Sequence, residues 1–493
     1  MENWLVNAVK VYGDHTAILT DREAISYSDL LLKVINIKIS IEENLKPNKA
    51  EKIAILLENR IDYVIVIHAF TFLDAIPVMI NTRLTSKEIK WQFETVNISK
   101  VIVSEKTKLA LNNNYFDNLT FYSVDHFADY VKFSSLQNKN IGSHFKNSLD
   151  PNKIQSLIYT SGTTGKPKPA TIKFSNIWAN SQGSAERLGI DKNDIWMLTL
   201  PLYHVGGLSI IFRSCINGTT IFLDYEFNIN RIIDRINKYN ITIISLVPNM
   251  LRRLLKKDKS SNELSKLRLI LLGGDRIDIS LTESCLKLNL QIAITYGMTE
   301  SVSQVATALS STVYKKPLSV GKSLQGIEVK IINENGLLCD NGQVGELVIT
   351  GSSVIDGYYN VSSDKFTDMG FYTGDIGYID DDGDIFILQR RVDLIISGGE
   401  NIYPSEIETY IKSIERVQDA CVIGIDDIKW GQIPIVLVQT DNDMNLEEII
   451  ISSCKENLAP YKIPKKIYFV KEFPRNSLGK LNRLEIRRLL DKL

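Results

Sequence analysis

The sequence predicts an α/β fold with a large N-terminal part and a smaller α+β C-terminal part. Short apolar runs alternate with helical patterns, which is typical of βαβ units with parallel strands. From about Gly345 the strands follow one another closely, with Gly and Asp turns, which predicts an antiparallel or barrel-like element. Beyond Arg391 the chain has its own strand and helix pattern and ends in a basic helix.

The elements follow from local patterns, taken here in chain order. The alternating pairs are Lys52–Leu57 with Tyr63–Leu73, Ile241–Val247 with Asn249–Leu255, and Leu267–Leu272 with Ser280–Leu288. The closely spaced strands are Gly345–Thr350, Phe371–Ile379 and Asp384–Leu388. A boundary near Asp393 divides the chain into a domain of residues 1–392 and a domain of residues 393–493.

Composition and charge exclude several classes of protein. Among 493 residues, 57 basic side chains nearly cancel 58 acidic ones, so a nucleic-acid or polyanion partner is not indicated. Five scattered cysteines without C-x-x-C spacing argue against a disulfide framework and a zinc site, and favour a cytoplasmic protein. The longest apolar stretch, Val64–Ile80, is interrupted by His68, Asp74 and Pro77, which favours a buried helix and a strand over a membrane span.

The segment Tyr159–Lys168 combines Gly, Ser and Thr with two lysines and follows the apolar run Ile154–Tyr159. Its backbone amides, hydroxyls and lysines could bind phosphate oxygens. A flexible linker is the alternative, but the strand and the lysines favour an ordered turn. The segment does not fit G-x-x-x-x-G-K-[ST], which disfavours simple γ-phosphoryl transfer. The predicted phosphate-binding residues are Thr160, Ser161, Gly162, Thr163, Thr164, Gly165, Lys166 and Lys168.

This segment resembles the signature of the adenylate-forming superfamily of acyl-CoA synthetases, adenylation domains and luciferases. Six more blocks occur in that superfamily's order, and the resemblance extends over about two thirds of the chain. Pro169 departs from the pattern, because the superfamily usually has Gly at this position. Proline has no backbone N–H, so the loop has one donor fewer for phosphate. The six blocks are Pro201–Gly207, Leu271–Asp275, Tyr296–Glu300, Tyr372–Asp375, Arg391–Pro404 and Pro474–Lys480.

The resemblance implies an ATP-, CoA- and Mg²⁺-dependent acid:CoA ligase that forms an acyl-adenylate and then a thioester. Tyr296–Glu300 follows an apolar run, so it should lie at the carboxyl end of a strand, where α/β sheets bind ligands. Tyr296 could stack on adenine, Thr299 could donate to the α-phosphate and the acyl oxygen, and Glu300 could hold Mg²⁺ unless it is a solvated surface acid. The other implied nucleotide residues are Gly273 and Gly274 along the adenine, Gly297, and Asp375 and Arg391 at the ribose.

Two half-reactions at one site are reconciled, in this superfamily, by rotation of the small domain about a hinge. Lys480 matches the catalytic lysine of the first step and Asp393 matches the hinge residue. Gly398 and Gly399 should line the pantetheine tunnel, although two glycines could simply turn the chain. Arg83, Trp430 and Lys465 are implied to hold the CoA nucleotide.

Four stretches carry a narrower resemblance: His204–Ser209 with Arg213, Ser245–Asn249, Tyr296–Gln304 and Arg390–Pro404. They look most like 2-succinylbenzoate:CoA ligases of menaquinone biosynthesis, whose acid keeps a free benzoate carboxylate. A buried anion needs a cation and hydrogen-bond donors. Arg213, on the apolar helix Leu208–Ile216, could be that cation, or its stem could pack while its head reaches water. Ser303 and Gln304 would add polar contacts, and His204 would gate the acyl pocket.

Three alternatives stay open at this point. An aryl- or fatty-acyl-CoA ligase would have an all-apolar acid pocket. A free-standing adenylation protein would load a carrier domain, but no carrier sequence follows the basic C-terminus. A non-catalytic nucleotide-binding paralogue is disfavoured by the presence of Lys480 and Glu300. The implied partners are small molecules, namely ATP, CoA and an aromatic keto-dicarboxylic acid, and a homo-oligomer is left open.

Overall fold

The computed structural model describes residues 1–126, 147–161, 167–258, 262–275, 277, 279–389, 394–441, 444–474, 481 and 483–490. The chain divides into two compact units. The first comprises Met1–Thr82, Gln92–Tyr159 and Pro169–Gln389. The second comprises Arg83–Trp91, Thr160–Lys168 and Arg390–Leu493. Asp393 lies outside the described residues, so the boundary placed there stays a prediction.

The largest sheet of the first unit has 14 strands and combines a parallel and an antiparallel part. Strands β9 to β12 are parallel neighbours, and their burial on both faces explains why each reads as an apolar run. The strands predicted from Gly345 onward are β17, β19 and β20, which are antiparallel neighbours. Strand β16, which precedes Gly345, pairs with β17, and β15 joins β20 to β14. In sheet order the strands are β16 (Ile327–Ile332), β17 (Gly345–Gly351), β19 (Gly370–Ile379), β20 (Ile385–Gln389), β15 (Ser319–Ser323), β14 (Ser303–Ala308), β13 (Ile292–Met298), β12 (Leu269–Leu272), β11 (Ile243–Leu246), β9 (Ile195–Leu198), β10 (Thr220–Leu223), β1 (Thr16–Leu19) and β2 (Ala24–Ser26), with β18 (Phe366–Thr367) on β19.

A second sheet of the first unit has six strands in the order β6-β5-β3-β4-β7-β8. Strands β3, β4 and β5 are parallel, as the βαβ pattern predicts. Pro169 lies in β8, the last strand in this order, and its carbonyl oxygen accepts from the amide of Tyr359 over 2.7 Å. The strands are β6 (Thr120–Ser123), β5 (Lys100–Val103), β3 (Glu51–Leu56), β4 (Ala75–Met79), β7 (Ile154–Ser161) and β8 (Pro167–Lys173).

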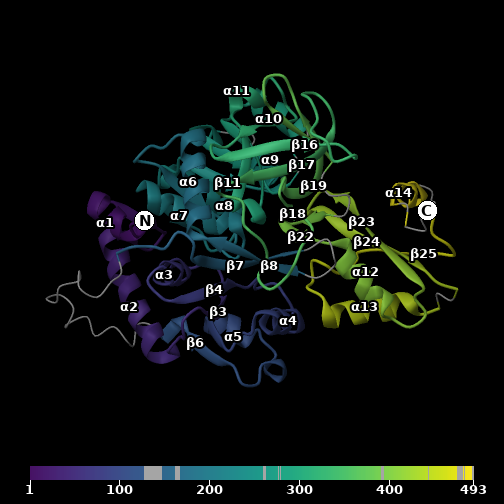
Figure 1. The fold of residues 1–493 in the computed structure, drawn as a ribbon, viewed down its shortest axis with the longest axis horizontal. Coiled ribbons are helices and arrows are strands. Elements are labelled where there is room, and N and C mark those ends of the chain that lie inside the picture. The colour runs from purple at the N-terminus through teal and green to yellow at the C-terminus, as the bar shows by residue number, and fades with distance from the viewer. Residues whose placement is uncertain are drawn as a thin grey trace. The chain divides into compact units, whose positions relative to one another are not determined.

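Some helices of the first unit begin at polar caps, and the helices bury apolar side chains. Asn3 and Ser26 cap the first two helices by accepting from backbone N–H groups. The predicted helix–strand reading of Val64–Ile80 is confirmed as α3 followed by β4. The helices are α1 (Trp4–Tyr12), α2 (Tyr27–Leu45), α3 (Ile61–Ala69), α5 (Glu105–Leu109), α6 (Phe174–Leu188), α7 (Val205–Asn217), α8 (Ile229–Lys238), α9 (Pro248–Lys257), α10 (Ile279–Lys287) and α11 (Ser310–Val313) (Figure 1).

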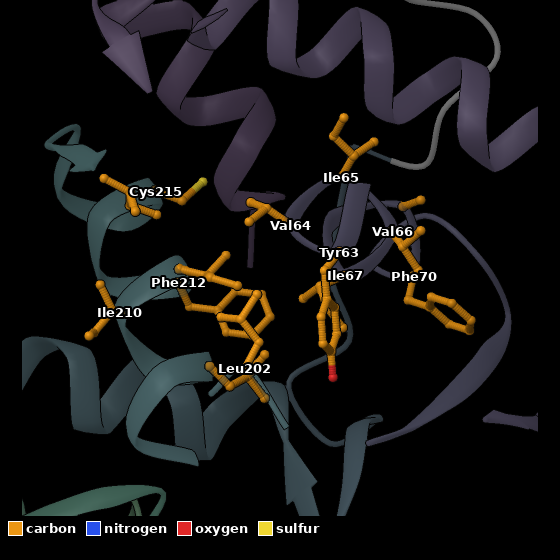
Figure 2. Close-up of a cluster of buried hydrophobic side chains, with 14 of the residues drawn as sticks. Tyr63, Val64, Ile65, Val66, Ile67, Phe70, Leu202, Ile210, Phe212 and Cys215 are labelled. Carbon is orange, nitrogen blue, oxygen red and sulfur yellow. The ribbon is translucent and has the colours of Figure 1, made fainter. Parts of the chain in front are cut away.

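The core that positions α7 is built with α3. In Figure 2, Phe212 of α7 and Leu202 lie next to the α3 residues Tyr63 and Val64. All four side chains are buried in one hydrophobic cluster. Because interiors are close-packed, this cluster fixes the rotation of α7 about its axis. It therefore fixes the direction of Arg213, the next residue after Phe212.

The second unit has a five-stranded sheet and its own hydrophobic core. Its elements from β21 onward appear in yellow-green and yellow in Figure 1. Its strands are β22 (Glu400–Ile402), β21 (Ile395–Ser397), β24 (Gly431–Gln439), β23 (Asp419–Asp427) and β25 (Ile467–Val470), and its helices are α12 (Pro404–Lys412), α13 (Leu446–Asn457) and α14 (Arg483–Leu490). The segment Arg83–Trp91, which contains the first turns of α4 (Ser86–Val96), also belongs to this unit.

Candidate active site

Two neighbouring parallel strands of the first unit end beside predicted nucleotide residues. Strand β12 ends at Leu272 and is followed by Gly273 and Gly274. Strand β13 ends at Met298 and is followed by Thr299 and Glu300 in a short 3₁₀ turn. The two strands are parallel, so these residues share the carboxyl edge of the sheet, the edge at which α/β sheets bind ligands.

The turn after β13 is tightly constrained by its backbone. A Cβ at Gly297 would lie 1.6 Å from the carbonyl oxygen of Ser303, so only glycine fits. Val302 and Ser303 have φ angles of 56° and 114°, and a β-branched residue rarely adopts such a conformation. Strain of this kind persists where the surrounding structure enforces it, often at functional sites. It lies here beside the predicted acid-binding residues Ser303 and Gln304.

Glu300 is a buried carboxylate and not a solvated surface acid. Its residue is 5% exposed, and the hydroxyl of Tyr358 donates to its Oε1 over 2.7 Å. Its backbone oxygen accepts from the amide of Ile355. A carboxylate oriented in this way at the carboxyl edge suits Mg²⁺, which prefers oxygen ligands. Sequence reasoning missed Tyr358, because no local pattern links residues 58 positions apart.

Tyr296 and Asp375 are brought together by the fold. The hydroxyl of Tyr296 donates to Asp375 Oδ2 over 2.6 Å. Asp375 lies inside β19, within the strand predicted as Phe371–Ile379. The register of β17 against β19 shifts at this point and Gly374 has a φ of 82°, so an irregularity interrupts the alternation of side chains there. The ring of Tyr296 is 1% exposed in this structure, and its stacking on adenine stays a prediction.

The start of α7 places His204. This residue is the N-cap of α7, and its carbonyl oxygen accepts from the amides of Gly207 and Leu208. Its ring lies edge-on to that of Tyr203, with centroids 4.7 Å apart. A Cβ at Gly207 would lie 2.3 Å from the carbonyl oxygen of Pro201, whereas one at Gly206 would meet only Leu200 at 3.5 Å. The backbone of the turn before α7 therefore packs directly on Gly207 and leaves no room for a side chain there.

Gly207→Ala should destabilise the protein and Gly206→Ala should not. The first variant forces the Pro201 carbonyl aside, at a cost of about 1–3 kcal/mol in the free energy of unfolding, as for other overpacked sites. The second replaces a helical glycine by a better helix former. Urea unfolding of both variants checks this, and equal midpoints would contradict it. Gly207→Ala should also lose activity, because the displaced turn carries His204.

Arg213 is buried within α7, and its head does not reach water. The residue is 3% exposed, and Nη2 donates to Asn180 Oδ1 over 2.6 Å. Its Nε has no hydrogen-bond partner among the described residues, and burial lowers the pKa of Arg213 to about 9. A buried guanidinium without a carboxylate is costly by itself. It is therefore suited to an incoming anion.

Asn180 connects Arg213 to the turn after β13. Its amide donates to the carbonyl oxygens of Ser301 and Gln304 over 3.1 and 2.8 Å. Arg213 also lines a cavity at the amino ends of β9, β10 and β11, away from the turn after β13. The residues lining this cavity include Asp194, Thr219 and Ile243. Sequence reasoning missed Asn180, since an asparagine in the middle of a helix gives no signal of its partners.

Gln304 is 1% exposed and anchors the same turn. Its Nε2 donates to Thr307 Oγ1 over 2.9 Å and to Thr295 Oγ1 over 3.3 Å. Its Oε1 is buried and has no partner among the described residues. An unpaired acceptor of this kind is available to a donor on a ligand.

The predicted CoA residues described by the structure lie in the second unit. Gly398 and Gly399 form the two-residue turn between β21 and β22, with φ angles of 60° and 86°. A Cβ at Gly398 would meet the ring of Trp430 at 2.9 Å, so the glycine allows close approach of that indole. Trp430 and Lys465 are exposed, and Arg83 pairs with Glu400. Their contacts with CoA stay predictions.

Part of the predicted site falls outside the described residues. Thr160 is buried in β7 and Lys168 is half-buried in β8, so the two strands frame the predicted phosphate loop. The side chain of Ser161 is not described. The residues outside the described part of the chain are Gly162, Thr163, Thr164, Gly165, Lys166, Arg391, Asp393 and Lys480. Across the described residues, no helix combines the length and apolar character needed to cross a membrane.

Comparison with known proteins assigns the chain to a family. Residues 5–359 match the family described as AMP-binding enzyme, and residues 406–480 match its C-terminal domain. A 2-succinylbenzoate–CoA ligase of Bacillus cytotoxicus is 36% identical over 100% of this chain and 99% of its own length.

Two solved structures of o-succinylbenzoate CoA synthetase from Bacillus subtilis are similar over 99% of this chain. A double mutant bound to the product analogue OSB-NCoA has a TM-score of 0.91, 32% identity and 98% coverage of its own chain. A complex with ATP and magnesium ion has a TM-score of 0.72, 31% identity and 99% coverage. With these matches along its whole length, the chain belongs to the family of AMP-binding enzymes.

Proposed function

We propose that this protein is an ATP-dependent 2-succinylbenzoate:CoA ligase of menaquinone biosynthesis. The observation that carries the proposal is the similarity over the full length of the chain to ligases named for this acid, at 34–36% identity. The buried, carboxylate-free guanidinium of Arg213 gives an independent physical reason, since this acid keeps one carboxylate after activation.

The reaction proceeds in two substitutions. The aliphatic carboxylate of the acid attacks the α-phosphorus of ATP and displaces pyrophosphate, and the CoA thiolate then attacks the acyl carbonyl and displaces AMP. Negative charge develops on the phosphates in the first step, so positioning and charge neutralisation provide most of the catalysis. Glu300 would hold Mg²⁺, which supplies charge neutralisation for the phosphates when bound.

The residues of this chain have separate roles in the proposal. Thr299 donates to the α-phosphate and the acyl oxygen, and Lys480 contacts the reacting oxygens. Asp375, held by Tyr296, accepts from the ribose hydroxyls. Arg213 pairs with the unreacted carboxylate of the acid, Ser303 and Gln304 line the acid pocket, and His204 gates it. The five cysteines are free thiols, which supports the cytoplasm as the compartment.

An assay of AMP release with a panel of acids tests the proposal. Purified protein with ATP, Mg²⁺ and CoA should release AMP with 2-succinylbenzoate far faster than with benzoate or a long-chain fatty acid. Omission of CoA should leave adenylate formation and stop thioester formation. Preference for benzoate or a fatty acid would replace the proposed acid but keep the reaction class. Adenylation without any CoA transfer would instead favour a carrier-loading protein.

A further inference from the structure

Lys462 is a buried ammonium group between two carboxylates of the second unit. Its Nζ donates to Glu88 Oε1 and to Glu406 Oε1, each over 2.7 Å, and its side chain is 5% exposed. Burial opposes the charged form, but Glu406 and Glu88 together raise the pKa of Lys462 above its ordinary value. The three side chains therefore form one buried charge cluster, here called the Lys462 cluster.

Glu88 uses its two carboxylate oxygens for different purposes. Oε2 accepts from the backbone amide and the hydroxyl of Thr85, both over 2.8 Å, and the Glu88 amide donates to Thr85 Oγ1. This reciprocal pattern is a capping box, which fixes the start of α4. Glu88 Oε1 accepts from Lys462, and so does Glu406 in the first turn of α12. The Lys462 ammonium therefore links the start of α4 to the start of α12.

The segment fixed by the Lys462 cluster also carries Arg83. Arg83 Nη1 lies 3.3 Å from Oε1 of Glu400, the residue after the Gly398–Gly399 turn. Lys87 Nζ donates to Asn457 Oδ1 over 2.6 Å. The segment Arg83–Trp91 thus has charged or polar contacts with Glu400 of β22, with Lys462 and with α13. Of these, the Lys462 cluster is the buried one, and a buried ion pair is sensitive to loss of either partner.

We infer that Lys462 is a positioning residue for the CoA step, holding the segment that carries Arg83 against the turn at Gly398–Gly399. This inference rests on the function proposed above. Removal of the ammonium leaves two carboxylates, only 12% and 15% exposed, that repel each other, so the start of α4 should move away from α12. The residues predicted to hold CoA would then lose their mutual arrangement. The adenylation residues Thr299, Glu300 and Asp375 belong to the first unit, whereas the Lys462 cluster belongs to the second.

Lys462→Met, with exposed Lys466→Met as the control, tests this inference. The first step is measured as acid-dependent exchange of pyrophosphate into ATP without CoA. The second is measured by loading the enzyme with acid and ATP and then adding CoA over a range of concentrations. Lys462→Met should lower kcat/KM for CoA about tenfold or more, mainly through KM, which matches the usual coupling through a side-chain network. Its exchange rate should equal that of the wild type, and Lys466→Met should change neither quantity.

Glu88→Gln is the second variant, because glutamine keeps an oxygen acceptor for the cap but removes the charge. It should reproduce the pattern of Lys462→Met, and it carries the test if that variant does not fold. Wild-type CoA kinetics in folded Glu88→Gln and Lys462→Met, or equal loss of both half-reactions, would overturn the inference. If 2-succinylbenzoate is not the substrate, the wild-type enzyme will not exchange pyrophosphate into ATP in its presence, which is a separate result. The comparison is then made with the acid that the panel identifies.

Discussion

Lys480→Ala should slow formation of the acyl-adenylate on the order of 10²- to 10³-fold, the usual cost of one lost charge-assisted contact in a transition state. Lys480 follows Pro474 and Gly479 in the block that resembles the catalytic lysine loop of adenylate-forming enzymes. Its ammonium would neutralise charge that develops on the α-phosphate and on the leaving pyrophosphate. The loss should therefore appear in kcat for pyrophosphate exchange more than in KM for ATP.

The same variant should leave the second half-reaction nearly intact. By resemblance, the lysine contacts the reacting oxygens only in the orientation used for adenylation. Supplied acyl-adenylate and CoA should therefore give thioester at a near-normal rate. Lys471→Ala is the control, because Lys471 is an exposed lysine nine positions earlier. Equal loss of both half-reactions in a folded variant would argue against alternation and make Lys480 a static site residue.

Arg213→Met should lower kcat/KM for 2-succinylbenzoate by about 10²-fold or more, the scale of a lost buried ion pair. Methionine approximates the stem of arginine but has no charge. Benzoate, which has no second carboxylate, should be affected much less. Because the guanidinium has no carboxylate among the described residues, its removal should cost little stability. Saturating 2-succinylbenzoate should raise the unfolding temperature of the wild type but not of the variant.

The Arg213 experiment also separates direct binding from an indirect effect. If Arg213 acts only through Asn180 on the turn that carries Ser303, activation of benzoate should fall as much as activation of 2-succinylbenzoate. Selective loss with the dicarboxylic acid supports a direct pair. Arg22→Met, which removes an exposed arginine, controls for a general loss of positive charge.

Local patterns in the sequence were sufficient to predict most of the elements. The apolar runs at Lys52–Leu57 and Leu267–Leu272 became β3 and β12, and Ser280–Leu288 became α10, each within two residues at either end. Gly273 and Thr299 follow apolar runs in the sequence, and both lie just beyond the end of a strand, as predicted. These features are local, because they depend on side-chain periodicity and on the backbone freedom of a few neighbouring residues.

The irregularity at Asp375 could not be predicted in this way. A single residue that interrupts a strand leaves the apolar pattern of Phe371–Ile379 almost unchanged. The burial of Arg213 was also undecided, because a long cationic side chain on an apolar helix can either reach water or stay inside. The packing of Phe212 against α3 decides between these two outcomes.

The sequence by itself determined the fold class, the order of the elements, the family and the residues at the strand ends. Only the tertiary structure decided which side chains meet: Tyr358 with Glu300, Asn180 with Arg213, Tyr296 with Asp375, and Lys462 with Glu88. The last two pairs are 79 and 374 residues apart in the chain. Such contacts depend on the simultaneous packing of whole sheets and helices, whereas periodicity reports only on neighbours along the chain.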